Sequence, residues 1–145
     1  MGTKEYSYIE WLSAEEMHSQ YRNWFSELVF IKDEELFLNN LIKSFTLQIL
    51  DSENYEKSKE LVSSLLDMEK RIVPLFKKIQ LHGNQLQIMI DDIDQLDLEK
   101  AYRDEHRSLL HDFKQYTMEY RILKKKLFKL VSGFIKDQKQ RTLLK

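Results

Sequence analysis

Histidines and carboxylates are the side chains of this sequence that could bind a metal ion. Glu15 and His18 have the i, i+3 spacing of a di-iron ligand pair, but a di-iron bundle needs two such pairs and two further glutamates. A divalent transition metal held by imidazoles and carboxylates from several helices is therefore the alternative hypothesis. Its candidate ligands are His18, His82, His106, His111, Glu15 and Asp92. In the leading interpretation the chain binds no cofactor, and its core histidines are neutral residues that hydrogen-bond a neighbour.

Apolar repeats predict the helices that must position these side chains. The first repeat alternates steps of four and three residues, the pattern of bundle and coiled-coil helices, which places its members along one side of a helix. Its members are Met17, Tyr21, Trp24, Leu28, Ile31, Glu35, Leu38, Ile42, Phe45 and Ile49. Because no Gly or Pro interrupts it, we predict one helix over residues 13–50, started by a capping box between Ser13 and Glu16.

Two more repeats of the same spacing predict helices over residues 55–96 and 98–138. Gly83 follows a run of basic residues in the second helix and could mark a turn at 82–84. The apolar spacing keeps its phase through this glycine, which favours one continuous helix. Three long helices with short connections form an antiparallel up-down bundle, whereas a turn at 82–84 would make it a four-helix bundle.

Composition supports an all-α fold, predicted as a single domain over residues 1–145 with residues 1–12 as a lead-in. Three Gly and one Pro are too few for the many tight turns of a sheet protein of this length. A net charge of −1 provides no general attraction to nucleic acid. No apolar window is long enough for a membrane span and no secretory signal is recognisable, so we expect a cytoplasmic protein.

The expected connections between helices also predict which residues lie at the same height. If the second connection is centred near residue 97, paired residue numbers in the second and third helices sum to about 194. His82 is then level with His111, and His106 is level with residue 88. The four histidines are predicted to gather at one end of the bundle.

Glu35 is the one charged residue in the first apolar repeat. A buried carboxylate is costly unless a cation or hydrogen-bond donors accompany it. Arg71 and Arg121 are predicted to lie near its height, so a buried ion pair is the first interpretation. A carboxylate used in catalysis or proton transfer is the second.

Several large apolar residues of the first predicted helix lie off its main repeat. These residues are Val29, Phe30, Leu36, Phe37 and Leu41. Soluble monomers seldom expose such a group, so a homodimer through this face is predicted. The alternative is that the aromatic lead-in, with Tyr6, Tyr8 and Trp11, or a fourth helix covers it.

Catalytic templates are absent from the sequence: it contains no Gly-rich phosphate loop, no G-x-S-x-G elbow and no H-E-x-x-H motif. Zero Cys excludes disulfides and thiolate chemistry. We therefore predict no catalytic residues and no enzyme activity. The expected function is that of a helical-bundle interaction or scaffold protein that self-associates and contacts a protein partner; a metal- or cofactor-binding bundle is the alternative.

Overall fold

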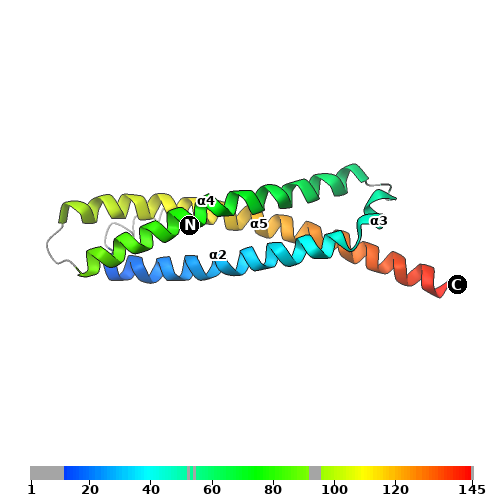
Figure 1. Ribbon diagram of the computed structural model, residues 1–145, viewed down its shortest axis with the longest axis horizontal. Coiled ribbons are helices and arrows are strands. Elements are labelled where there is room, and N and C mark those ends of the chain that lie inside the picture. The colour runs from blue at the N-terminus through cyan, green and yellow to red at the C-terminus, as the bar shows by residue number, and fades with distance from the viewer. Residues whose placement is uncertain (1–11, 52, 54, 92–95, 145) are drawn as a thin grey trace. The chain divides into compact units, whose positions relative to one another are not determined.

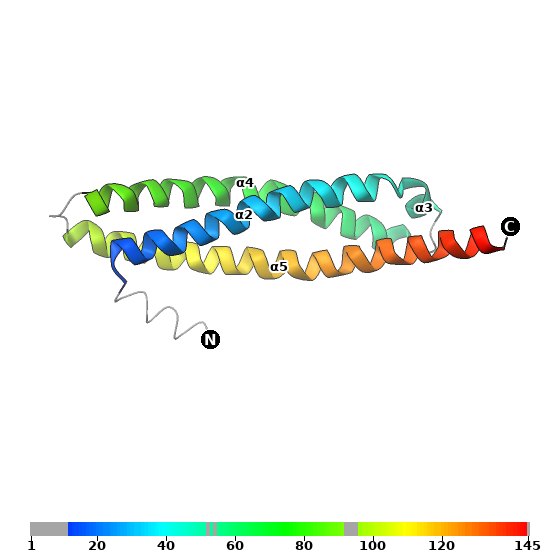
Figure 2. The same cartoon turned by 90° about the horizontal axis from the view of Figure 1, so that it is seen from below.

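The described residues of the chain form four α-helices (Figure 1). The computed structural model describes residues 12–51, 53, 55–91 and 96–144. Within those residues there is no strand, and the helices are α2 (Ala14–Lys43), α3 (Thr46–Leu50), α4 (Tyr55–Asp91) and α5 (Leu96–Leu143). Three of them are long and successive ones run in opposite directions, which confirms the predicted all-α up-down bundle (Figure 2).

The long helices contribute to two compact units. The first unit comprises Met1–Phe30 and Ile72–Tyr116, and the second comprises Ile31–Arg71 and Thr117–Lys145. Each unit therefore contains one segment of α2, one of α4 and one of α5. The second unit also contains the short helix α3.

The first unit packs the predicted repeat of α2 against α4 and α5. Leu28 of α2, Ile79 of α4 and Leu109 of α5 are almost completely removed from solvent. Trp24 stacks on Phe113 with ring centroids 5.8 Å apart. These contacts confirm that the four-and-three spacing marks the buried side of each helix.

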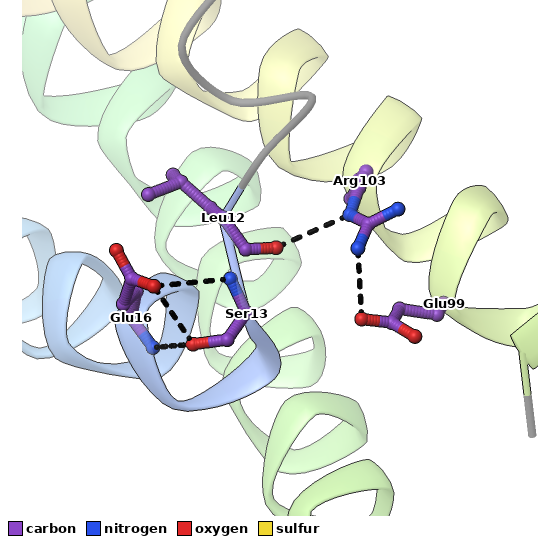
Figure 3. A network of polar contacts seen from close by, with 5 residues as sticks. All are labelled: Leu12, Ser13, Glu16, Glu99 and Arg103. Atoms are coloured by element: carbon purple, nitrogen blue, oxygen red, sulfur yellow. Dashed lines mark hydrogen bonds and ion pairs between the residues drawn. The ribbon is translucent and has the colours of Figure 1, made fainter. Parts of the chain in front are cut away.

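The start of α2 has the predicted capping box (Figure 3). The Glu16 backbone N–H donates to Ser13 Oγ at 3.1 Å, and the Ser13 N–H donates to Glu16 Oε1 at 3.4 Å. Two orphan N–H groups at the helix end thereby gain acceptors. Arg103 of α5 donates from Nε to the Leu12 carbonyl at 3.1 Å and pairs with Glu99, which ties this end of α2 to α5.

The second unit has its core along the later parts of the same repeats. Leu38 of α2, Leu65 of α4 and Leu127 of α5 are fully buried. Phe45 stacks on Phe134 of α5 with ring centroids 5.7 Å apart. Phe45 thus stays in the core although it lies between two helices.

The prediction of one uninterrupted helix over residues 13–50 is wrong at its end. α2 stops at Lys43, and α3 begins at Thr46. Ser44 Oγ donates to the Leu41 carbonyl and Thr46 Oγ1 donates to the Lys43 carbonyl, both at 2.6 Å. Side-chain hydroxyls that bond nearby carbonyls compete with the helical ladder. Neither Gly nor Pro is needed for such a break.

The four-helix alternative is also wrong, because α4 runs through residues 82–84 without a turn. Gly83 is buried, and a Cβ built on it would overlap the ring of Tyr21 on α2. The glycine therefore lets an aromatic ring lie directly on the α4 backbone. α4 ends at Asp91 and α5 spans Leu96–Leu143, so the predicted boundaries 55–96 and 98–138 are each shifted at the connection, and α5 continues beyond 138.

Gly83→Ala is expected to lower the free energy of unfolding by about 1 kcal/mol, because the new methyl group must displace the Tyr21 ring. In a Tyr21→Ala background the same substitution should instead raise stability by about 0.5–1 kcal/mol, since Ala favours a helix over Gly. Urea unfolding of the four proteins forms a double-mutant cycle. Equal stabilisation in both backgrounds would show that the ring does not pack on Gly83.

Candidate functional sites

A chain of hydrogen bonds links two buried histidines and a glutamine in the first unit. His82 of α4 lies with Nε2 at 2.9 Å from Nδ1 of His106 on α5. His106 Nε2 is 2.8 Å from Gln20 Oε1 on α2. Since the amide oxygen is an acceptor, His106 donates from Nε2 and accepts at Nδ1 from His82. All three long helices thus contribute one polar side chain to a single connected group.

The surroundings of the histidine pair keep both rings neutral. His82 and His106 have 1% and 0% of their surface exposed. Burial lowers the pKa of His82 to about 4. Burial, and then the neighbouring His82, lower the pKa of His106 to about 3. Trp24 covers His106 with its ring centroid 4.4 Å away. In this setting the pair acts as a neutral polar connection inside an apolar core.

The remaining atom of the pair is His82 Nδ1, which is buried and has no hydrogen-bond partner among the described residues. With the proton of His82 on Nε2, this nitrogen carries a lone pair. A lone pair of this kind could accept a proton or a metal ion. One nitrogen alone does not make a metal site, which needs several converging ligands.

The structure brings together two of the six predicted metal ligands. His18 is half-buried beside the Tyr21 ring, while Glu15 and His111 are exposed. Asp92 lies outside the described residues. Within the described part of the chain, no three histidine, aspartate or glutamate side chains are arranged to hold a metal ion. The bond between His82 and His106 instead matches the interpretation of core histidines as neutral residues.

The pairing of His82 with His106 also corrects the predicted register. The predicted register places His106 level with residue 88. In the structure its partner is His82, which lies six residues earlier on α4. The connection begins after Asp91 and ends before Leu96, so its centre is earlier than residue 97. In an antiparallel pair of helices, paired residue numbers sum to twice the number at the centre of the connection. A centre that lies one residue earlier therefore shifts the partner of His106 by two residues, which accounts for the difference between residue 88 and His82.

The second unit has its polar centre beside Glu35. Glu35 is buried on α2, as predicted, and its charge contributes to a raised pKa at Tyr120 of α5. The neighbouring Glu34 accepts hydrogen bonds from the Tyr120 hydroxyl at 2.7 Å and from Lys124 Nζ at 3.0 Å. Burial is the largest cause of the higher Tyr120 pKa, followed by the bond to Glu34. This phenol stays protonated as a donor.

One predicted partner of Glu35 pairs with two other acids. Arg71 pairs with Glu119 of α5 and with Asp67 one turn earlier on α4. Arg121 lies exposed on α5. The ion pair of Glu35 with Arg71 and Arg121 therefore stays a prediction. The hydrogen bonds found next to Glu35 join Glu34 to Tyr120 and Lys124. The sequence did not single out Glu34, because it lies just off the apolar repeat.

The predicted self-association residues are mostly exposed on α2. In the first unit, Val29 and Phe30 are 39% and 61% exposed; in the second, Leu36 and Phe37 are 60% and 56% exposed. Leu41 is half-buried. No fourth long helix lies among the described residues to cover these side chains. The lead-in residues Tyr6, Tyr8 and Trp11, named as the other possible cover, lie outside the described residues.

Neither family models, nor curated proteins, nor solved structures include a match to this chain. Its function must be inferred from its own residues. In the part of the chain that the structure describes, no helix combines the length and apolar character required to cross a membrane.

Proposed function

We propose that this chain is a non-enzymatic helical-bundle interaction protein that self-associates through the outer side of α2. The observation that supports the proposal is the exposure of Phe30, Leu36 and Phe37, each more than half accessible to solvent. Phe30 and Phe37 are seven residues apart, which is close to two turns of an α-helix. Exposed large apolar groups clustered on one element favour a protein partner.

A second copy of the chain is the partner that these residues suit. An isologous contact lets each copy bury the same side chains against the other. The exposed parts of Val29, Phe30, Leu36 and Phe37 amount to roughly 400 Å² per copy, which is below the area of most stable interfaces. The proposed dimer is therefore weak and should respond to concentration.

Asp33 sets a further limit on this contact. It lies three residues after Phe30 and four before Phe37, and it is exposed. An antiparallel two-fold arrangement centred between the two phenylalanines brings the Asp33 carboxylates of both copies close together. Their mutual repulsion costs affinity, so Asp33→Asn is expected to strengthen the dimer.

Sedimentation equilibrium from about 1 to 200 μM tests the proposal in the range expected of weak complexes. The wild type should pass from monomer to dimer, and a Phe30→Glu/Phe37→Glu variant should remain monomeric with an unchanged helical circular dichroism spectrum. Ile88→Glu is the matched control, because Ile88 is equally exposed but lies on α4. That control should dimerise like the wild type.

Each other outcome counts against the proposal. A wild type that is monomeric throughout the range would end the homodimer hypothesis. Loss of dimerisation in the Ile88→Glu control would indicate nonspecific association through scattered apolar residues. Unfolding of the double variant would place the two phenylalanine rings inside the core of one chain.

A further inference from the structure

The break between α2 and α3 leaves an apolar cleft in the second unit. Its volume is about 430 Å³. α2, α3 and α4 all line it, and Ile42, Ile49 and Val62 are apolar lining residues that are buried or half-buried. Leu50 and Leu66, at 58% and 44% exposed, lie at its mouth. The cleft therefore exposes apolar surface that the described residues leave open to solvent.

The break also explains why the cleft exists. If α2 continued as one straight helix, residues 46–50 would extend along the axis of α2. Instead α2 ends at Lys43, the hydroxyls of Ser44 and Thr46 bond carbonyls at the break, and the chain continues as α3. Thr46 and Leu50 then line the cleft from one side, while Tyr55 lines it from α4.

Among the residues that the structure describes, the charged groups that line the cleft are positive. They are Lys43 of α2 and Lys59 of α4, and no described Asp or Glu lines it. Burial raises the pKa of the Glu69 carboxyl, and the nearby Lys43 charge partly offsets this rise. For Lys59, no Asp or Glu carboxylate is among the contacts made by the described residues. The hydroxyl of Tyr55 and the amide of Asn39 supply further polar groups.

We propose that this cleft binds a single-chain amphiphile with a carboxylate head group, namely a medium-chain fatty acid. The carboxylate faces Lys59 and Lys43, and the alkyl chain lies against Ile42, Ile49 and Val62. Ligand sites range over roughly 300–1,000 Å³, and a volume near the lower end suits one alkyl chain rather than a two-chain phospholipid. This site is separate from the self-association surface and does not depend on it.

Calorimetric titration with octanoate, decanoate and dodecanoate, each below its micelle concentration, tests the apolar part. Each methylene group that is fully buried raises the binding affinity about fourfold. Because the mouth of the cleft is open, affinity is expected to rise about two- to fourfold per added methylene. An affinity independent of chain length would overturn the proposal.

Matched variants test the position of the site. Lys59→Gln should weaken dodecanoate binding about three- to tenfold, the usual scale for a partly exposed ion pair and its hydrogen bond. Lys57→Gln, an exposed lysine of α4 outside the cleft, should leave it unchanged. Leu66→Glu should abolish binding without unfolding, because Leu66 is partly exposed. Leu81→Glu, an exposed leucine elsewhere on α4, should have no effect.

The nature of the head group is tested with dodecyltrimethylammonium, which has the same chain and the opposite charge. Dodecanoate should bind at least tenfold more tightly. Equal binding of the two amphiphiles, or equal loss in the Lys57→Gln and Lys59→Gln variants, would contradict the charge argument. Because burying an alkyl chain releases little heat near 25 °C but changes the heat capacity, the titration is done at two well-separated temperatures. No heat of binding at either temperature, with any of the three fatty acids up to millimolar concentration, would rule out the site, whatever the oligomeric state of the chain proves to be.

Discussion

Lowering the pH from 7 to 5 should reduce the free energy of unfolding by about 3–4 kcal/mol through His82 and His106. Their pKa values in the folded chain are about 4 and about 3, against 6.5 for an ordinary histidine. Between these limits the unfolded chain binds protons that the folded chain does not. The contribution of the two histidines to the free energy of unfolding is therefore fully present above about pH 6.5 and decreases as the pH falls. It stops decreasing once the pH is below their pKa values in the folded chain.

Urea unfolding at half-unit steps from pH 7.5 to 5 measures this loss. The His82→Gln/His106→Gln variant should be less stable at pH 7 but should lose much less stability between pH 7 and 5. His111→Gln, which alters an exposed histidine, should keep the wild-type slope. His18 adds a smaller effect of the same sign, since its pKa is also lowered. A wild-type slope in the double variant would show that the pair does not cause the acid sensitivity.

Leu28→Ala and Leu127→Ala should each reduce the free energy of unfolding by about 2–5 kcal/mol. Both leucines are fully buried, Leu28 in the first unit and Leu127 in the second. Removing their side chains leaves cavities that packed helices cannot close without distortion. Leu81→Ala serves as the control and should change stability by less than about 0.5 kcal/mol, because Leu81 is exposed.

The same two variants address whether the chain is one domain, as predicted. All three long helices contribute to both compact units, so we expect one unfolding transition that both substitutions shift to lower temperature. Two calorimetric transitions, of which each substitution moves only one, would contradict the single-domain prediction.

The fold could be predicted from the sequence because burial on a helix is periodic. Met17, Leu28 and Leu38 belong to one repeat, and each is buried in the structure. The end of α2 could not be found in this way, since Phe45 and Ile49 keep the apolar spacing and stay buried beyond the break. Two local hydroxyl bonds lie at the break, and they depend on backbone geometry that spacing does not encode.

The candidate sites could be predicted only in part. The repeat placed His82 and His106 in the core, and both are buried there. Their contact with each other depends on the register between α4 and α5, which in turn depends on the position of one connection. Gln20 could not be singled out at all, because it lies beside the main repeat and matters only for the acceptor it offers to His106.

The hydrogen-bond chain of the first unit closes two loops of very different length. His82 and His106 are 24 residues apart, whereas His106 and Gln20 are 86 residues apart. Closing the longer loop costs about 1 kcal/mol more in chain entropy, because this cost grows with the logarithm of length. The contact of α4 with α5 is thus the cheaper one to form from the unfolded chain. We therefore expect the histidine pair to form before Gln20 reaches His106.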